Sequence, residues 1–304
     1  MRYNGYMIKI DIISGFLGAG KTTFANMLLR HYFDMGLRPV FIVNEFGQTG
    51  LDADIIQAEG FNALKMEGGC ICCTLKNDIS VAILQVIETF SPSNIVFEPS
   101  GIFVFNNFFD ILKEPAIATK CVLGCVLTVV DSINFSLAKV QYGSFMFNQI
   151  KHAKVVLLSK LERAQAWADE LICDIKNINP DALIVLKAWE EWIADDFGEI
   201  LGQNSFLEDY QMRHHDNLQS MTITLQTLLT QVQIDQLVSG CISGKFGDLC
   251  RVKGIIATSE KLVLLQIVMQ DVSQNEFRGP GSLALTFIGQ TVDSSALRSF
   301  FAAI

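Results

Sequence analysis

The sequence lacks an apolar run long enough to cross a membrane, and it carries little positive charge. Its longest candidate run, residues 121–130, has the length of a strand, whereas a membrane-spanning helix needs about 20 apolar residues. Against 32 Asp and Glu the chain has only 23 Lys and Arg, a net charge of -9. An acidic surface repels nucleic-acid backbones and anionic membranes. We therefore expect neither nucleic acid nor a membrane among its partners.

Features of an export signal are also missing, and histidine is scarce. Lys9 and Asp11 interrupt the first apolar run, and no small-residue cleavage site follows it. We expect a cytoplasmic protein, whose eight cysteines are free thiols, metal ligands or redox groups rather than structural disulfides. Only four histidines are present, which excludes a histidine-rich metal store.

Hydrophobic residues make up 50% of the chain, and in its first part they form short runs rich in Val, Ile and Leu. Such runs suit strands that are buried on both faces. Helical patterns, such as residues 21–34, lie between them, and this alternation predicts a mostly parallel sheet covered by helices. The predicted strands are residues 7–13, 39–44, 94–98, 122–131, 155–159 and 182–186.

The pattern changes near residue 201. We expect a first domain at 1–201, a polar linker at 202–220 and a smaller α+β domain at 221–304. No internal repeat is visible in the chain. The predicted strands of the second domain are residues 221–225, 251–256, 262–269 and 283–288, its helices are 228–238 and 294–301, and a turn-rich loop covers 275–282.

Residues 15–22 read Gly-Phe-Leu-Gly-Ala-Gly-Lys-Thr, which satisfies the P-loop pattern. Glycines let the backbone wrap around phosphate oxygens, helped by the positive end of the following helix. The lysine supplies charge to the β- and γ-phosphates, and the threonine hydroxyl is placed to bind magnesium. With a predicted strand before it and a helix after it, the motif predicts a P-loop NTPase. The residues expected to bind nucleotide here are Gly15, Gly18, Ala19, Gly20, Lys21, Thr22 and Thr23.

A second nucleotide-sensing segment is expected at residues 94–101, Asn-Ile-Val-Phe-Glu-Pro-Ser-Gly. Glu98 follows an apolar run and can reach magnesium through water, and the Gly101 N–H can meet the γ-phosphate. We take Lys21 and Glu98 as the catalytic residues, although an ordinary carboxylate at the end of a strand would look the same. The predicted magnesium site comprises Thr22, Glu98 and Asp52.

Three cysteines lie within four residues beside a pair of glycines, in Gly-Gly-Cys-Ile-Cys-Cys at residues 68–73. Thiolates are soft ligands that suit zinc, copper(I) or cobalt(II), and three of them leave a fourth tetrahedral position open. We expect Cys70, Cys72 and Cys73 to hold a transition metal with Glu45 among the candidate fourth ligands. A redox pair and buried packing are the alternatives.

The remaining cysteines and a histidine pair carry weaker signals. Cys121, Cys125, Cys173, Cys241 and Cys250 are expected to pack in the core as small hydrophobic residues. His214 and His215 lie in the predicted linker, where a solvated loop explains such a pair better than metal binding does.

Taken together, these motifs resemble the CobW-type GTPases, relatives of the nickel-insertion GTPases of hydrogenase and urease maturation. The resemblance rests on GFLGAGKTT, on VNEFGQTGLD at residues 43–52, on GGCICCTL at 68–75 and on EPSG at 98–101. It extends to GDLCRVKGI at 247–255 and LTFIGQTVD at 285–293 in the second domain. The resemblance implies GTP hydrolysis coupled to metal delivery, with a metal site lying between two nucleotide-sensing segments.

Two positions depart from the family pattern. The guanine site usually reads Asn-Lys-x-Asp, and here the matching residues are Ser159, Lys160, Leu161 and Glu162. Glu162 keeps the carboxylate that accepts from guanine on a longer side chain, while a serine replaces only part of the hydrogen bonding of an asparagine. Gln48 stands where the family often has Glu, which removes one carboxylate near Glu45.

The function expected from the sequence is a GTPase metallochaperone. It would bind GTP and magnesium, hold a transition metal, with zinc the first candidate and cobalt the second, and release it to a client metalloprotein or cofactor enzyme. Turnover is expected to be slow, because no stabilising arginine is identifiable. Two alternatives stay open: a nucleotide-gated module for a cofactor enzyme, such as one that uses a corrinoid, and an ATPase if guanine is not selected.

Overall fold

The structure is a computed structural model that describes residues 7–44, 51–66, 75–163, 168–203, 219–278 and 281–302. The chain divides into two compact units, one formed by Met1–Glu45 and Glu59–His215 and the other by Phe46–Ala58 and Asp216–Ile304. The domain boundaries expected at 201 and 221 stay a prediction, since residues 204–218 lie outside the described part.

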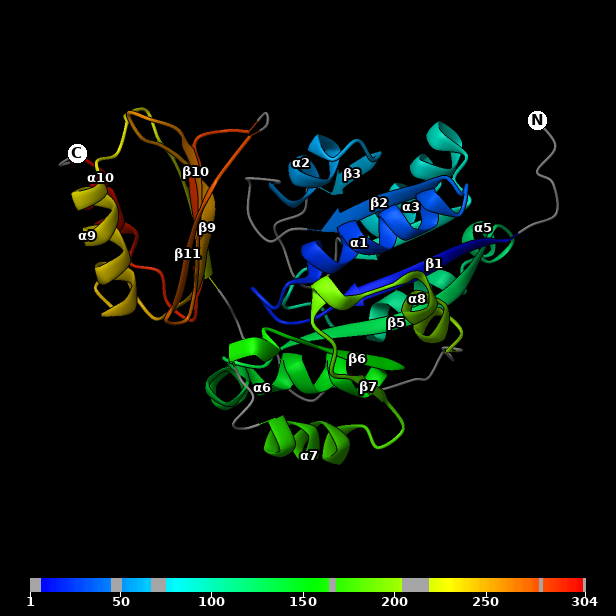
Figure 1. Ribbon diagram of the computed structural model, residues 1–304. Helices are drawn as coiled ribbons and strands as arrows, with labels where there is room; N and C mark the ends of the chain where they lie inside the picture. The colour runs from blue at the N-terminus through cyan, green and yellow to red at the C-terminus, as the bar shows by residue number, and fades with distance from the viewer. Residues whose placement is uncertain are drawn as a thin grey trace. The chain divides into compact units, whose positions relative to one another are not determined.

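The first unit contains a parallel sheet of seven strands in the order β3-β2-β4-β1-β5-β6-β7 (Figure 1). Every strand pair in it is parallel, so all carboxyl ends lie along one edge. The strands are β1 (Ile8–Ser14), β2 (Pro39–Asn44), β3 (Ala63–Met66), β4 (Asn94–Glu98), β5 (Cys121–Asp131), β6 (Val155–Ser159) and β7 (Leu183–Val185). The predicted α/β class with a mostly parallel sheet is confirmed.

Strand β3 was not predicted from the sequence. It has four residues, is interrupted by Lys65, and pairs only with β2 at the edge of the sheet. A short edge strand needs little burial, so it leaves no long apolar run to recognise.

Helices pack on both faces of this sheet. Helix α1 contacts β1, β2 and β4, and α8 contacts α1 and β5. Helices α3, α4 and α5 contact one another, and α6 lies beside α4, where the ring of His152 lies 5.4 Å from that of Phe109. The helices of this unit are α1 (Lys21–Asp34), α3 (Leu75–Phe90), α4 (Asn106–Leu112), α5 (Pro115–Ala118), α6 (Phe135–His152), α7 (Ala168–Ile178) and α8 (Ala194–Leu201), with 3₁₀ turns η1 (Leu161–Arg163) and η3 (Trp189–Glu191).

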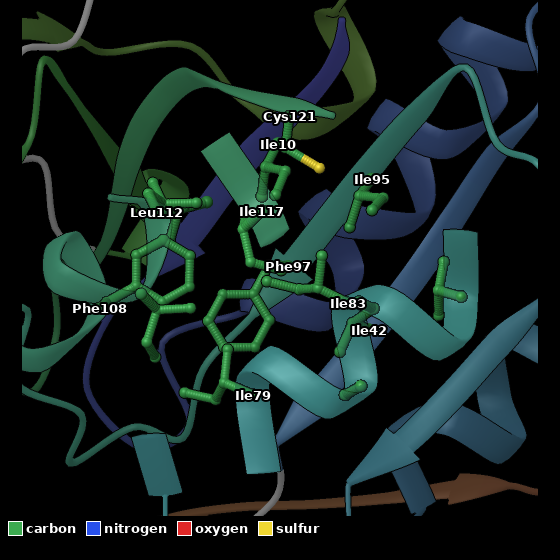
Figure 2. Packing of buried hydrophobic residues seen from close by; sticks show 14 of the residues in the cluster. Ile10, Ile42, Ile79, Ile83, Ile95, Phe97, Phe108, Leu112, Ile117 and Cys121 are labelled. Atoms are coloured by element: carbon green, nitrogen blue, oxygen red, sulfur yellow. The ribbon is translucent and has the colours of Figure 1, made fainter. Parts of the chain in front are cut away.

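Aromatic and branched side chains fill the space between the sheet and α3–α5, as Figure 2 shows. Ile10, Ile95 and Phe97 project from the strands, and Phe97 stacks on Phe108 of α4 at 5.1 Å between ring centroids. All four are buried. Burial of each such side chain stabilises the fold by about 1.5–3 kcal/mol.

Strand β1 alternates between this core and a buried polar group on its other face. Ile10 and Ile12 belong to the core, whereas the intervening Asp11 accepts hydrogen bonds from Tyr32 Oη of α1 at 2.6 Å and from Cys125 N at 2.8 Å. Burial raises the pKa of Asp11, opposed by the charge of Lys9. The carboxyl group therefore ties the strand before the P-loop to α1 and β5.

The second unit is an antiparallel sheet in the order β11-β10-β9-β12-β8 (Figure 1). Its strands are β8 (Gln219–Thr224), β9 (Leu249–Ala257), β10 (Leu262–Val268), β11 (Asp271–Glu276) and β12 (Ala284–Gly289). Side chains of α9 (Gln231–Ile242) and α10 (Ser294–Ala302) join the alternate strand residues in one core. Helix α2 (Leu51–Ala58) groups with this unit. The predicted smaller α+β domain is confirmed.

Two details of this unit differ from the sequence prediction. Strand β11 was missed, and its last residues, Asn275 and Glu276, fall in the predicted loop. Helix α9 begins at Gln231 rather than at Leu228, because Thr230 and Gln233 form a capping box. Within the described residues, no helix combines the length and the apolar content that a membrane span requires.

Candidate functional site

The P-loop connects β1 to α1 at the carboxyl edge of the parallel sheet. Gly15, Gly18 and Gly20 all have positive φ angles, of 145°, 75° and 100°. A Cβ at Gly15 would collide with the Val129 carbonyl oxygen of β5, so only glycine fits this close approach. The three glycines thus have backbone conformations that other residues rarely adopt, and their contact with phosphate stays a prediction.

Lys21, Thr22 and Glu98 meet beside this loop. Lys21 is only 5% exposed, and its Nζ lies 3.3 Å from Phe16 O and 4.0 Å from Glu98 Oε1. Thr22 Oγ1 donates a hydrogen bond to the same Glu98 oxygen at 3.2 Å. Thr23, the next residue, is exposed at the start of α1. The structure therefore brings together three of the side chains that the sequence assigned to phosphate and magnesium.

Gly101 lies between the P-loop and α6. A Cβ on Gly101 would lie 2.6 Å from Leu17 N of the P-loop, so a larger residue would push the two segments apart. On the other side, Gln149 Nε2 donates to Gly101 O at 3.1 Å and to Phe103 O at 3.2 Å. Gly101 is thus held against the P-loop, and its contact with a γ-phosphate stays a prediction.

Gln149 is a residue of the site that sequence reasoning missed. It is fully buried, and its backbone oxygen accepts a hydrogen bond from Thr128 Oγ1 at 2.9 Å. Thr128 Oγ1 in turn lies 2.7 Å from Ser14 Oγ, directly before the P-loop. This buried chain links the P-loop to the segment after Glu98. A single glutamine in a helix has no pattern by which the sequence alone could reveal it.

The predicted guanine-binding residues lie on the other side of β1, at the end of β6. Ser159 is buried, and its Oγ lies 2.7 Å from Ala19 O of the P-loop and 3.2 Å from Val130 O. Lys160 has a left-handed φ of 59°, and its Nζ lies 2.8 Å from Asp131 Oδ2. Glu162 is exposed in η1. Ser159 therefore contacts the P-loop, and Glu162 keeps its carboxylate accessible to a ligand.

Asp131, at the end of β5, is another residue that the sequence reading did not single out. Its Oδ1 accepts from Ile133 N at 2.9 Å and from Asn134 N at 3.2 Å, and its Oδ2 also accepts from Asn134 Nδ2 at 2.8 Å. It closes the turn before α6 and anchors Lys160. Its place at the end of an apolar strand was the available signal.

An aromatic cluster covers the first turns of α1. The ring of Phe24 lies 5.4 Å from Trp189, 5.1 Å from Trp192 and 6.0 Å from Phe197. Trp189 belongs to η3, after the end of β7, and is partly exposed. The sequence reading gave these aromatic residues no role, although a tryptophan three residues after a predicted strand was visible.

The residues at the phosphate site fit magnesium, which prefers oxygen ligands. A hydroxyl and a carboxylate, Thr22 Oγ1 and Glu98 Oε1, meet at 3.2 Å. The side chain of Asp52, the third predicted ligand, lies outside the described part of the structure. When bound with nucleotide, magnesium would neutralise charge on the β- and γ-phosphates.

The predicted transition-metal site cannot be placed. Cys70, Cys72, Cys73 and Glu45 lie outside the described residues, as do Gln48, His214 and His215. No group of three or more His, Cys, Asp and Glu side chains suited to a metal occurs in the part of the chain that the structure covers. The thiol site stays a prediction.

The other cysteines divide into buried and exposed groups. Cys121, Cys125, Cys241 and Cys250 are buried. Burial raises the pKa of Cys121 to about 11 and those of Cys125 and Cys241 to about 12, so these three thiols stay protonated at neutral pH. Core packing is confirmed for all four. The prediction was wrong for Cys173, which is exposed on α7.

Comparison with known proteins identifies the family. Residues 9–186 match the family described as CobW/HypB/UreG, nucleotide-binding domain. This chain belongs to the CobW/HypB/UreG family. Residues 218–304 also match the description Cobalamin synthesis protein cobW C-terminal domain. The suspected relationship to CobW-type proteins is confirmed, and with it the P-loop fold of the first unit.

Several curated relatives share parts or all of the chain. Zinc chaperone CobW of Sinorhizobium sp is 35% identical over 138 residues, which cover 43% of this chain and 38% of that protein. Zinc chaperone YjiA of Escherichia coli (strain K12) is 24% identical over 327 residues, covering 98% of each chain. The crystal structure of Zn(II)-bound YjiA GTPase from E. coli has 20% identity and a TM-score of 0.49, with 98% of both chains covered. The match with zinc chaperone CobW of Sinorhizobium sp therefore spans less than two fifths of that protein's length.

Proposed function

We propose that this protein binds and hydrolyses GTP with magnesium and acts as a metallochaperone that carries zinc to a client protein. The main support for the proposal is that the side chains of Lys21, Thr22 and Glu98 lie close together beside a glycine-rich loop. Thr22 Oγ1 lies 3.2 Å and Lys21 Nζ 4.0 Å from the same carboxylate oxygen. Membership of a family of nucleotide-binding domains supports the nucleotide, and relatives named zinc chaperones support the metal.

Each residue of the phosphate site has a distinct task in this proposal. The backbone N–H groups of residues 15–22 bind phosphate oxygens, and the Lys21 ammonium stabilises negative charge on the β- and γ-phosphates. Thr22 supplies a magnesium ligand, and Glu98 organises the metal and its water. Since Lys21 and Glu98 are 5% and 3% exposed, their charges act where water screens little.

The Gly101 segment would sense whether the γ-phosphate is present. Its N–H is expected to meet that phosphate, while its carbonyl oxygen is fixed by Gln149 Nε2 at 3.1 Å. Loss of the γ-phosphate would remove the partner of the Gly101 N–H, while the hydrogen bond from Gln149 to the Gly101 oxygen would remain. Such a differential contact is what a nucleotide-dependent switch requires.

The metal is proposed to bind Cys70, Cys72 and Cys73, with Glu45 as a candidate fourth ligand. Three thiolates suit zinc and also cobalt, and the relatives' names favour zinc. A fourth position that is open or weakly held would let the metal pass to a client metalloprotein. Nucleotide state and metal affinity would be coupled by about 5- to 150-fold, the usual range for linked sites.

Metal titration of the purified protein tests this function. Zinc and cobalt are titrated with a non-hydrolysable GTP analogue, with GDP and without nucleotide. The same titrations use a variant with Cys70, Cys72 and Cys73 changed to Ser, and Cys173→Ser as the matched control, since that thiol is exposed. We expect zinc affinity to depend on the three thiols and on the nucleotide, and to be unchanged in the control.

Two other results would change the proposal. Metal binding that ignores the nucleotide would favour a nucleotide-gated module whose thiols are structural. Unchanged metal binding in the variant with all three cysteines replaced would show that the metal site lies outside residues 70–73.

A further inference from the structure

Trp189 borders the P-loop from the side of β6 and β7. A Cβ built on Gly20 would lie 3.8 Å from Ser159 Cβ and 4.0 Å from Trp189 Nε1. The indole and the predicted guanine-binding segment therefore reach the same point of the P-loop. Trp189 is partly exposed there, so a ligand at this point can contact its ring.

The order of the strands shows which part of a nucleotide would lie beside Trp189. The groups assigned to magnesium and the γ-phosphate, Glu98 and Gly101, follow β4, which adjoins β1 on one side. Ser159 ends β6 and Trp189 follows β7, both on the opposite side of β1. A nucleotide with its γ-phosphate near Glu98 would extend its base and ribose toward β6 and β7.

Trp189 and its neighbour Trp192 differ in how their indoles are held. Both contact Phe24, at 5.4 Å and 5.1 Å between ring centroids. Trp192 Nε1 donates to Lys187 O at 3.4 Å, and its ring lies 5.0 Å from Phe197 of α8. For Trp189 Nε1, no hydrogen bond is found within the described residues. Both rings are partly exposed, but the indole N–H of Trp192 is used within the fold, whereas Trp189 retains its donor for a ligand.

We propose that Trp189 is a nucleotide-binding residue that contacts the base or ribose of the bound nucleoside triphosphate. This inference rests on the nucleotide binding proposed above and assigns it a further residue. An indole stacks on any base, since every base has a π-face. Trp189 therefore contributes affinity for adenine and guanine nucleotides alike, and Glu162 provides the discrimination between them.

Competition binding with GTP, ATP and inorganic tripolyphosphate tests this role. Tripolyphosphate has the phosphates and no nucleoside, so it reports on the P-loop alone. In Trp189→Ala we expect affinity for GTP and ATP to fall about tenfold, the size of a lost base–aromatic contact, while tripolyphosphate binds as in the unmodified protein. Trp192→Ala is the matched control and should not change the ratio of GTP to tripolyphosphate affinity.

Tryptophan fluorescence provides a second measurement on milder variants. Nucleotide should quench the emission of the unmodified protein and of Trp192→Phe, and this quenching should be lost in Trp189→Phe. Unchanged GTP affinity in Trp189→Ala, or an equal loss for GTP and tripolyphosphate, would overturn the inference, because the ring would then only support α1. If the unmodified protein binds tripolyphosphate and neither nucleotide, the proposed function fails together with it.

Discussion

The two sides of β1 differ in how firmly they hold the groups that would meet a nucleotide. On the β4 side, Glu98 is 3% exposed and bonded to Thr22, and Gly101 is fixed between Leu17 and Gln149. On the β6 side, Glu162 is exposed and Trp189 is partly exposed. Ser159, the third described group on this side, is buried, and its hydroxyl hydrogen-bonds to the backbone oxygen of Ala19 in the P-loop.

This difference matches the demands of the two tasks. Stabilising charge during phosphate transfer needs preorganised groups at fixed distances, which buried and bonded side chains provide. Binding a base needs an accessible surface and tolerates variation, since stacking does not depend on the identity of the base. One departure from the family pattern, at Ser159 and Glu162 of the guanine motif, falls on the β6 side, while the other, Gln48, lies outside the described residues.

The largest effect is expected from Lys21→Ala. Removing the ammonium deletes the charge that stabilises the phosphates, so GTP hydrolysis should fall by about 1,000-fold or more, measured as phosphate release. Lys139→Ala is the control, because it removes a lysine that pairs with Asp174. Unchanged hydrolysis in Lys21→Ala would reject the P-loop assignment.

Next in size is Glu98→Gln, which keeps the shape of the side chain and removes its charge. Turnover should fall by about 100-fold through weaker organisation of magnesium. GDP binding without magnesium should change little. Glu114→Gln, at a carboxylate that accepts from Ser80 at 2.9 Å, controls for the loss of one negative charge. A variant that hydrolyses GTP at the normal rate would make Glu98 an ordinary carboxylate at the end of a strand.

Gln149→Leu tests whether the β4 side depends on its buried hydrogen bonds. The change leaves the oxygens of Gly101 and Phe103 without this donor, so the free energy of unfolding should fall by about 1–3 kcal/mol, measured by urea denaturation. Hydrolysis should fall more than GDP affinity does. Gln203→Leu is the control, because it removes an exposed hydrogen bond from Nε2 to Glu199 O. Its free energy of unfolding and its rate of GTP hydrolysis should stay unchanged.

The smallest effect is expected from Glu162→Gln on the accessible side. Guanine would lose a charged acceptor, so the preference for GTP over ATP should drop about tenfold, as for a lost two-bond contact to a base. Affinity for ATP should stay constant in competition binding. Glu191→Gln, in the neighbouring η3 turn, is the control. A constant preference would show that guanine is selected elsewhere or not at all.

Most of the fold was predicted from local sequence patterns, above all from short apolar runs. The limits of β2, β4 and β6 agree with the apolar runs at 39–44, 94–98 and 155–159, because central strands of a parallel sheet are buried on both faces. The P-loop glycines also lie where the motif predicts. Strand β11 was missed because its sequence, Asp-Val-Ser-Gln-Asn-Glu, is polar and is held by pairing with β10 at a sheet edge.

The remaining contacts of the candidate site join residues that are far apart in the sequence, so no local sequence pattern predicts them. Asp131, Gln149 and Trp189 reach the P-loop region or its partners only because β5, α6 and β7 are brought beside it by the fold. Conversely, the strongest chemical signal in the sequence, at Cys70, Cys72 and Cys73, lies outside the described residues and stays a prediction. Motifs mark candidate ligand-binding residues, and the residues that position them are found only in three dimensions.

The parallel sheet of the first unit has two edges with different roles. The described residues assigned to the nucleotide lie at or after the carboxyl end of a strand or belong to the P-loop, and the amino ends carry none of them. The connections at residues 35–38, 91–93, 119–120 and 153–154 lie at the opposite edge, about 16 Å away along a five-residue strand. A reporter group at Met35, which is 62% exposed, would therefore follow unfolding or tumbling of the nucleotide-binding unit without touching the bound nucleotide.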